Sequence, residues 1–277
     1  MIALLALMLP AASAGAHQPK LVRVVKREGA FTATLTYIVN RPKPVSDVTL
    51  RIRHGSRLVL TRKLCEFGFR EYHGCGWLAP PAGLHVSRIG PSNRPAFLLD
   101  IWNGGNHCCI ETFIAALGKH ITWIKREWSG ADGWDFYKIK RSGGHTLFVT
   151  GDGRFFCVFS MCAAATVPIR VFAINRSDSF VNVTRHFPGM IRANARRLAT
   201  VHGRRVTARA MVVDYGSGVL AAWCGDEYLL GKGARCSRVL AWAVKRHWPE
   251  RMAGEFPSRR VARALNHDLV RWGYKPR

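Results

Sequence analysis

The spacing of apolar residues along the chain changes once, from alternate positions to every third or fourth position. Residues 31–39, FTATLTYIV, alternate apolar and polar side chains, as a strand with one buried face does. Residues 47–64 predict a hairpin that turns at Gly55. The apolar positions expected on its buried side are Val48, Leu50, Ile52, Leu58 and Leu60. Its polar positions carry Arg51, Arg53, Arg57 and Arg62, which suits a solvated face.

Residues 96–188 contain two copies of one pattern. Each copy has an apolar strand, a turn with an acidic residue and glycine, a stretch with cysteine and two further strands. The acidic residues are Asp100 and Asp152, and their separation of 52 residues is typical of a propeller blade. Two copies are too few to close a propeller. Two blade-like sheets packed face to face, or two sheets joined to the N-terminal strands, are equally good interpretations.

After residue 188 the period becomes helical. Residues 189–201 place Ile191, Ala195 and Leu198 on one side, and residues 258–272 repeat an apolar residue every four positions. The expected fold class is α+β, with a β-rich first two-thirds that contains a two-fold blade-like repeat, followed by a helical C-terminal subdomain. The expected divisions are a signal peptide at 1–16, an N-terminal β region at 17–90, a two-repeat region at 91–188 and a basic helical subdomain at 189–277.

The first sixteen residues indicate export. An apolar run from Ile2 to Leu9 precedes small residues that fit the rule for signal-peptidase cleavage, which we expect before His17. No later window is long and apolar enough to span a bilayer. The expected location is therefore secreted or periplasmic, and the cysteines are expected to be oxidised there.

The eight cysteines are even in number, which fits disulfide bonds. We expect Cys65 to pair with Cys75 across a short loop, and Cys224 with Cys236 across a connection between two helices. Cys108 and Cys109 are adjacent on an expected strand and point to opposite faces, so each is expected to pair with Cys157 or Cys162. Which of them pairs with which stays open.

The segment NGGNHCCIET, residues 103–112, has the composition of a metal site as well as that of a turn. His107 and the two cysteines supply ligand atoms, but zinc ligands are usually spaced by two or more residues so that they converge. We therefore interpret the segment as a turn held by disulfides, and expect no metal and no cofactor.

The charge is strongly basic, with 42 lysine and arginine residues against 17 acidic ones and a net charge of +25. An arginine-rich genome would produce this excess without any function. The functional interpretation is attraction to an anionic cell-surface polymer or lipid. On the last expected helix the arginines lie opposite the apolar positions and are candidates for that contact: Arg259, Arg260 and Arg263.

Known catalytic motifs fail to match. Tyr215-Gly216-Ser217-Gly218 lacks the first glycine of a nucleophile elbow, and residues 225–232 have the wrong spacing for a phosphate-binding loop. Asp132, Asp135 and Asp152 lie in ordinary turn sequences. The candidates for a catalytic site are Asp100, His107 and Glu111, with His145 as a further partner. The competing interpretation is that Asp100 caps the turn after it and His107 packs on disulfides.

Three segments carry a resemblance: LLDIWNGGNHCC, GDGRFFCVFSMCAAATVPIRVFAI and FVNVTRHFP. They resemble a family of exported bacterial proteins, without an assigned reaction, that have a DLYxGGAHCC-like and a DVTRxFP-like segment. In such relatives the first segment often follows an acidic loop like the calcium loops of integrin-type propeller repeats. This chain has GPSNRP at residues 90–95, with no carboxylate, so calcium is not expected there. The resemblance implies export and fold only.

The function these observations predict is an exported, disulfide-stapled binding or structural protein that contacts anionic material of the envelope or the extracellular space. The alternative is a secreted hydrolase that uses Asp100, His107 and Glu111. Nucleic-acid binding is disfavoured by the export signal and by the absence of a recognised module. The oligomeric state is not predicted.

Overall fold

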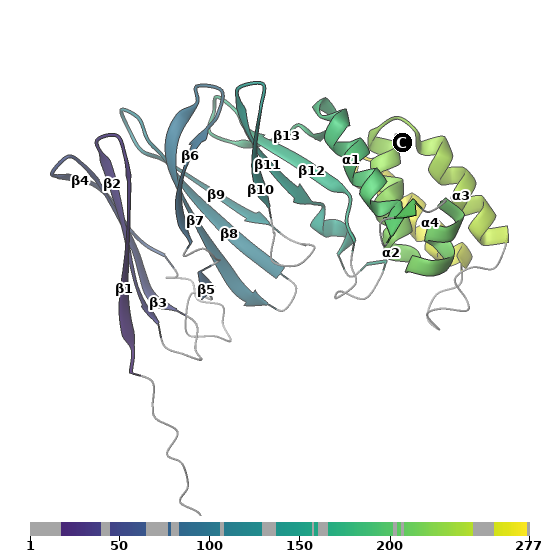
Figure 1. Ribbon diagram of the computed structural model, residues 1–277, viewed down its shortest axis with the longest axis horizontal. Coiled ribbons are helices and arrows are strands. Elements are labelled where there is room, and N and C mark those ends of the chain that lie inside the picture. Colours follow the sequence, from purple (N-terminus) through teal and green to yellow (C-terminus); the bar gives the residue numbers. More distant parts are fainter. Residues whose placement is uncertain are drawn as a thin grey trace, which may run out of the picture.

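The computed structural model describes residues 18–39, 45–64, 77–78, 83–105, 108–128, 137–156, 158–159, 166–201, 204–205, 208–245 and 258–275. Three antiparallel sheets follow one another in sequence order, and a group of helices follows the third sheet (Figure 1). The expectation of a β-rich part followed by a helical part is confirmed. The sheets are open at their edges in the described part of the chain.

The first sheet is a simple meander. Its strands, paired in the order β1-β2-β3-β4, are β1 (Lys20–Glu28), β2 (Phe31–Val39), β3 (Ser46–His54) and β4 (Arg57–Lys63). In β2 the alternation works as expected, because Ala33, Leu35 and Tyr37 are buried while the threonines between them face the other side. The predicted hairpin turns at Gly55, whose φ of +56° is the region glycine enters without steric cost.

One buried position predicted in this hairpin is wrong. The register between β3 and β4 shifts after Ile52, which pairs with Leu60, so that Arg53 pairs with Leu58. The irregularity moves Leu58 to the face opposite Leu60, and Leu58 is 46% exposed. Arg62 is exposed as expected, although it pairs with buried Leu50, and its guanidinium carbon lies 6.0 Å from the centre of the Trp123 ring of the second sheet.

The second sheet is built around one long strand. Its strands are β5 (Trp77–Leu78), β6 (Leu84–Ile89), β7 (Arg94–Gly105), β8 (Cys108–Ala116) and β9 (Thr122–Trp128). Both β5 and β6 pair with β7, along different parts of it, and β8 and β9 continue on the other side. The boundary expected after residue 90 falls between β6 and β7, inside this sheet.

The third sheet is again a meander, paired in the order β10-β11-β12-β13. Its strands are β10 (Lys138–Ser142), β11 (His145–Gly151), β12 (Ile169–Ile174) and β13 (Phe180–Asn182). A short 3-10 helix, η1 (Gly153–Phe155), follows β11. The two sequence copies therefore lie on β7 to β9 and on β11 to β13, in two neighbouring sheets.

The sheets stack face to face, and each interface has its own apolar core. Between the first and second sheets lie Leu35, Leu50, Phe97 and Leu99. Neighbouring residues of β7 alternate between faces, so Ala96 and Leu98 point the other way, to a second core with Trp128 and Phe148. The outer face of the first sheet is left at one end of the stack (Figure 1).

The C-terminal part packs helices on the far side of the third sheet. After η3 (Thr184–His186) its elements are α1 (Pro188–Leu198), β14 (Thr200–Val201), β15 (Arg204–Arg205), α2 (Ala208–Leu229), α3 (Gly233–Lys245) and α4 (Ser258–Arg271). Ile191, Ala195 and Leu198 are buried, as predicted, in a core that also holds Phe155 next to the third sheet. Among the described residues, no helix has the length and apolar character of a bilayer crossing.

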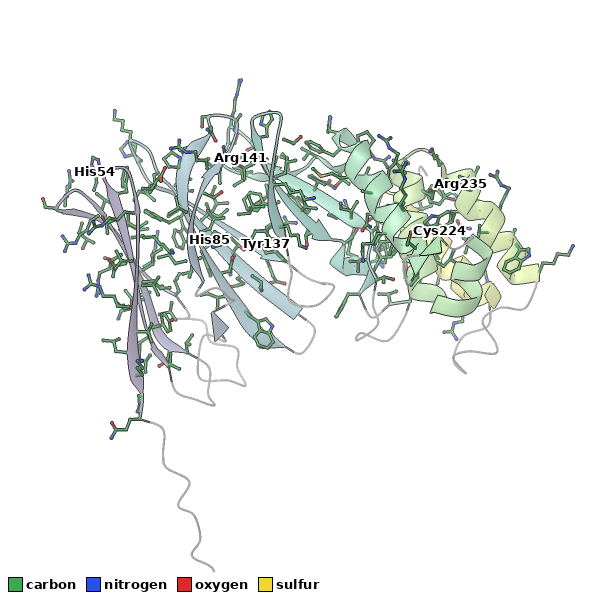
Figure 2. The ribbon with its side chains drawn as sticks, viewed as in Figure 1. His54, His85, Tyr137, Arg141, Cys224 and Arg235 are labelled. Atoms are coloured by element: carbon green, nitrogen blue, oxygen red, sulfur yellow. A yellow bond between two sulfur atoms is a disulfide. The ribbon has the colours of Figure 1, made fainter. Side chains whose placement is uncertain are left out.

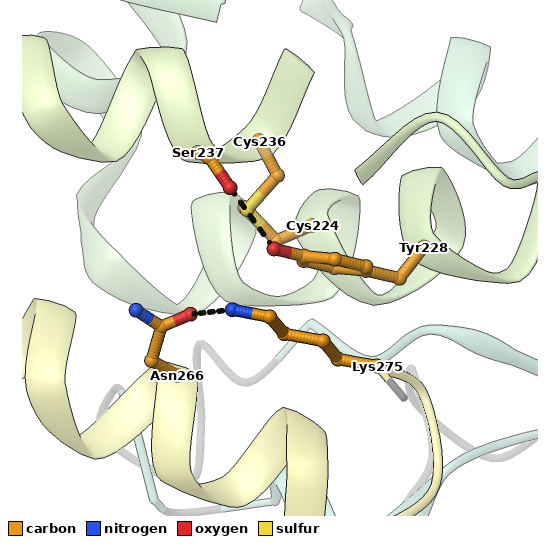
Figure 3. The surroundings of a disulfide bond; sticks show 6 residues. All are labelled: Cys224, Tyr228, Cys236, Ser237, Asn266 and Lys275. Atoms are coloured by element: carbon orange, nitrogen blue, oxygen red, sulfur yellow. Dashed lines mark hydrogen bonds between the residues drawn. A yellow bond between two sulfur atoms is a disulfide. The ribbon is translucent and has the colours of Figure 1, made fainter. Parts of the chain in front are cut away.

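The disulfide predicted between Cys224 and Cys236 is present (Figure 3). It joins α2 to α3 across the turn at Gly231, whose φ is +73°. Around it, the Tyr228 hydroxyl and Ser237 Oγ are 3.0 Å apart, and Lys275 Nζ donates to Asn266 Oδ1 at 3.3 Å. Both sulfur-bearing residues are fully buried, so the bond lies within the helical core.

Candidate functional site

Asp100 is the predicted catalytic residue whose contacts the structure describes most completely. It lies inside β7 rather than at its end, and its side chain points to the third sheet, on the face of Leu98. Its carboxylate accepts hydrogen bonds from Thr112 Oγ1 and, at 2.9 Å, from the Tyr137 hydroxyl. The expectation that Asp100 caps the turn after it is wrong, because β7 continues to Gly105 and no turn follows Asp100 directly.

Burial governs the electrostatics of this carboxyl group. Desolvation raises the pKa of Asp100, while the hydrogen bonds and the nearby His85 oppose the rise. His85 Nε2 lies 3.9 Å from Asp100 Oδ2, and its side chain is partly exposed. Figure 2 shows His85 on the second sheet and Tyr137 on the chain that enters the third. Thr112 also accepts from Trp128 Nε1 at 2.8 Å, so Asp100 belongs to a buried network between two sheets.

Of the other predicted catalytic residues, Glu111 and His145 are described, and neither joins Asp100 in one site. Glu111 pairs across the sheet with Ile101, so it faces the first sheet while Asp100 faces the third. Glu111 Oε1 lies 2.6 Å from Lys125 Nζ. His145 is exposed at the start of β11. His107, Asp132 and Asp135 lie outside the described residues.

The NGGNHCC segment covers the end of β7 and the start of β8, and residues 106–107 between these strands lie outside the described residues. Gly105 ends β7 and pairs with Cys108, which begins β8, so the two glycines belong to the strand. The side chains of Cys108 and Cys109 lie outside the description, as do Cys65, Cys75, Cys157 and Cys162. Their disulfides therefore stay predictions. No group of three histidine, cysteine or acidic side chains gathers within the described residues.

Asp152 is a second buried carboxylate, and it occupies the end of β11 as a turn residue. Its side chain accepts from the backbone N–H of Arg154, as the turn interpretation predicts. It also accepts from Arg170 Nε at 2.9 Å and from the Tyr274 hydroxyl at 2.6 Å. The pattern around Asp152 gave no signal for Tyr274, which is 122 residues away. Asp152 is thus a contact between the third sheet and the C-terminal segment.

The glycines of the segment that nearly matches a phosphate-binding loop serve packing. A Cβ atom on Gly225 of α2 would lie 2.7 Å from Pro168 Cγ and 3.3 Å from Tyr274 Cε1. A Cβ atom on Gly233 would lie 2.1 Å from the Tyr228 ring. Both positions are therefore glycine, because the side chains of Pro168, Tyr274 and Tyr228 leave no space for a Cβ atom.

The outer face of the first sheet combines cations with threonines. Arg23 and Arg27 on β1, and Arg51 and Arg53 on β3, are exposed there. The register sets them in rows across the sheet: Arg23-Thr36-Thr49-Lys63, Val25-Thr34-Arg51-Thr61 and Arg27-Thr32-Arg53-Leu58. We call these twelve residues the outer basic face. The alternation of arginines in the sequence indicated a polar sheet face. It did not indicate how the rows align across the strands.

Of the two carboxylates of this sheet, one faces away from the outer basic face and the other lies beyond its last row. Glu28 belongs to the opposite face of β1, where its Oε1 accepts from Arg88 Nη2 of the second sheet at 3.0 Å. Asp47 lies near the start of β3, beyond the row of Arg23. No ion pair to a carboxylate is formed by Arg23, Arg27 or Arg51 within the described residues. Their charge is therefore directed to solvent.

The arginines predicted on the last helix lie on α4. Arg260 and Arg263 are exposed, and each has an interaction with a neighbour. They lie on the side away from Leu265 and Leu269, which are buried in the helical core. The side chain of Arg259 is outside the description. This helix face offers fewer described cations than the outer basic face.

The comparisons with known proteins add no relative to this picture, so the resemblance to the exported family stays a prediction. No family model, curated protein or solved structure matches the chain.

Proposed function

We propose that this protein is an exported, non-catalytic binding protein that holds an anionic polymer of the cell envelope or the extracellular space. The outer basic face is the proposed contact surface. The observation that carries the proposal is the alignment of exposed cations with threonine hydroxyls on one sheet face, whose twelve residues include no carboxylate; Glu28 of β1 points to the opposite face.

The spacing of this face suits a chain of repeated negative charges. Residues two apart on one strand are about 7 Å apart, and β1 and β3 are separated by about 10 Å because β2 lies between them. Arg51 and Arg53 therefore present adjacent positive charges along β3. Arg23 and Arg27 present two more along β1, on the same face of the sheet. Arginine binds phosphate and sulfate oxygens in a fork, and threonine hydroxyls add donors between the cations.

The remaining parts of the proposal support a rigid, extracytoplasmic scaffold. We infer that the second and third sheets repeat one blade-like unit, because both copies place an acidic residue at the second strand of a meander. We infer export from the leader and the even number of cysteines. A rigid sheet face keeps the arginines in fixed positions, which reduces the entropy lost on binding.

The experiment compares variants that lose equal charge. Arg23→Gln with Arg51→Gln is expected to weaken binding to immobilised heparin, a sulfated polysaccharide, by about tenfold or more at 0.15 M salt. Its salt dependence should also become shallower by about two ion contacts. The matched control is Arg192→Gln with Arg196→Gln on α1, both exposed, which should change binding little.

Two further measurements locate the surface. Arg260→Gln with Arg263→Gln tests the α4 face. Equal losses of heparin affinity in this variant and in the sheet variant would show that binding depends on net charge and not on the outer basic face, which would contradict the proposal. Vesicles with anionic phospholipid test the other class of ligand. Tight binding to vesicles combined with none to the polysaccharide would also contradict a polymer-binding face.

A further inference from the structure

A cleft of about 280 Å³ opens between the facing sides of the second and third sheets. Its walls come from elements far apart in sequence. Arg126 and Trp128 of β9 form one wall, and Arg170 and Phe172 of β12 form the other, with Asn182 of β13 beside them. Because Asn182 pairs directly with Phe172, its side chain shares the face of Phe172.

Arg126 is a cation held by aromatic rings, and no carboxylate among the described residues forms an ion pair with it. Its guanidinium carbon lies 4.3 Å from the ring centre of Phe172, 5.4 Å from Trp128 and 5.7 Å from Phe180. Its Nε is buried and has no hydrogen-bond acceptor in the part of the chain that the structure describes. Ring stacking uses the face of the guanidinium, whereas its N–H donors lie in the plane. The Nη groups of Arg126 form no hydrogen bond or ion pair with a described residue, so they remain available as donors.

The surroundings of Arg126 make an anion favourable. Burial lowers the pKa of Arg126, and the positive charge of Arg170 lowers it further. Arg170 itself is compensated, because Asp152 accepts from its Nε at 2.9 Å and its Nη2 lies 2.8 Å from the same carboxylate. Arg154 shares Asp152 as well. Arg126, Arg170 and the more exposed Arg154 thus line the cleft around one buried carboxylate. Arg126 and Arg170 are desolvated, and such cations repel each other unless an anion joins them.

Asn182 contributes a second unused donor. Its Oδ1 accepts from the Thr184 backbone N–H at 3.0 Å and from Thr184 Oγ1 at 2.5 Å. These bonds determine which end of the amide is oxygen, because a backbone N–H can only donate. The Nδ2 group therefore points its two hydrogens elsewhere, with no acceptor among the described residues. Glu127, the other carboxylate at the rim, is exposed and belongs to the opposite face of β9.

We propose that this cleft binds a tetrahedral oxyanion, either phosphate or the phosphate group of a small ester, between Arg126, Arg170 and Asn182. A tetrahedral anion presents oxygens to both walls at once, whereas a planar carboxylate presents its two oxygens to one side. Arg126 binds one edge of the anion, Arg170 supplies Nη1, and Asn182 Nδ2 binds a third oxygen. This site lies between the sheets and does not depend on the outer basic face.

The test is calorimetric titration of the whole protein with inorganic phosphate, and in a second arm with glycerol phosphate, against chloride at constant ionic strength. Saturable binding of one anion per chain is expected in at least one arm. Tighter binding of the ester would assign the site to a phosphate ester, and equal or tighter binding of inorganic phosphate would assign it to the free ion. No saturable binding in either arm would overturn the proposal.

Two variants locate the anion. Arg126→Gln removes the charge, and Asn182→Asp keeps the acceptor for Thr184 while placing a carboxylate where the anion would bind. Each is expected to weaken phosphate binding at least tenfold, and Asn182→Asp is expected to raise the Tm in phosphate-free buffer. The matched control is Arg192→Gln on α1, an exposed arginine that does not line the cleft, and this variant should bind phosphate normally. Unchanged phosphate binding in a folded Asn182→Asp protein would overturn the site.

Discussion

At the scale of single residues, Asp226 is the carboxylate where the helices meet the third sheet. It is fully buried on α2, and its oxygens accept from the backbone N–H of Ile169 at 3.1 Å and from Asn194 Nδ2 at 2.7 Å. Burial raises its pKa from 3.8 to about 8, although these hydrogen bonds and the charge of Arg197 oppose the rise. The folded protein therefore holds a proton that the unfolded chain loses.

This buried proton predicts a pH-dependent stability. Between about pH 4 and pH 8 the unfolded chain ionises Asp226 while the folded protein does not, so the free energy of unfolding falls as pH rises through that window. The Tm is expected to drop by roughly 5–10 °C from pH 5 to pH 8. Asp226→Asn should flatten this slope, whereas Asp47→Asn at an exposed position should keep it. An identical slope in the Asp226→Asn protein, measured by circular dichroism, would refute the assignment.

At the scale of elements, local geometry decides which side chains reach a surface. The irregularity after Ile52 places Leu58 in the outer basic face, beside Arg53 and Thr32. Without that shift, β4 would turn the same residue to the apolar core. A single extra residue in a strand thus sets both the packing of the first sheet and the composition of its exposed face.

The α2–α3 pair depends on its covalent bond. The disulfide closes a loop with a sequence separation of 12, and such a cross-link lowers the entropy of the unfolded chain by an amount equivalent to about 3 kcal/mol. Cys224→Ala with Cys236→Ala is expected to lower the free energy of unfolding by this order, measured by guanidinium denaturation with circular dichroism. Reduction of the unmodified protein with dithiothreitol should produce at least this loss, because it also breaks the disulfides predicted elsewhere in the chain. A stability unchanged by both treatments would contradict a stabilising role.

At the scale of the whole molecule, buried tyrosines connect successive layers. Tyr137, next to the third sheet, donates to Asp100 of the second, and Tyr274, after the last helix, donates to Asp152 at the end of the third. Burial raises the pKa of both hydroxyls, so they remain protonated donors. Asp100 and Asp152, the acidic residues of the two sequence copies, therefore each accept a hydrogen bond from the layer that follows in the chain. They do not form one shared site.

Tyr274→Phe tests this connection. Removing the hydroxyl leaves a buried carboxylate short of one hydrogen bond, which costs about 1.5–3 kcal/mol for a charged partner. Tyr37→Phe is the control, because Tyr37 is also buried and its hydroxyl makes no hydrogen bond to a described residue. Its stability should change by less than about 1 kcal/mol. Equal effects of the two changes in chemical denaturation would argue against the tyrosine contact.

Much of the fold was predictable where the signal is local. The alternation in residues 31–39, the turn at Gly55, the helix that buries Ile191, Ala195 and Leu198, and the bond from Cys224 to Cys236 depend on residues near one another in sequence. The sheet face on which Leu58 lies was predicted wrongly, because a prediction from alternation assumes an unbroken register between the strands. Of the candidate catalytic residues, Asp100 and Glu111 were grouped by proximity in sequence although strands alternate their faces.

The sequence by itself determined the period of each element, the strong positive charge and the α2–α3 cross-link, because backbone periodicity and short loops act over a few residues. Only the tertiary structure decided that Asp152 meets Tyr274, that the arginines of β1 and β3 form one face, and that Arg126 faces Arg170. These contacts depend on sheet order and stacking, and packing between distant segments leaves no fixed spacing in the chain. Function, as proposed, resides in surfaces that the stacking assembles.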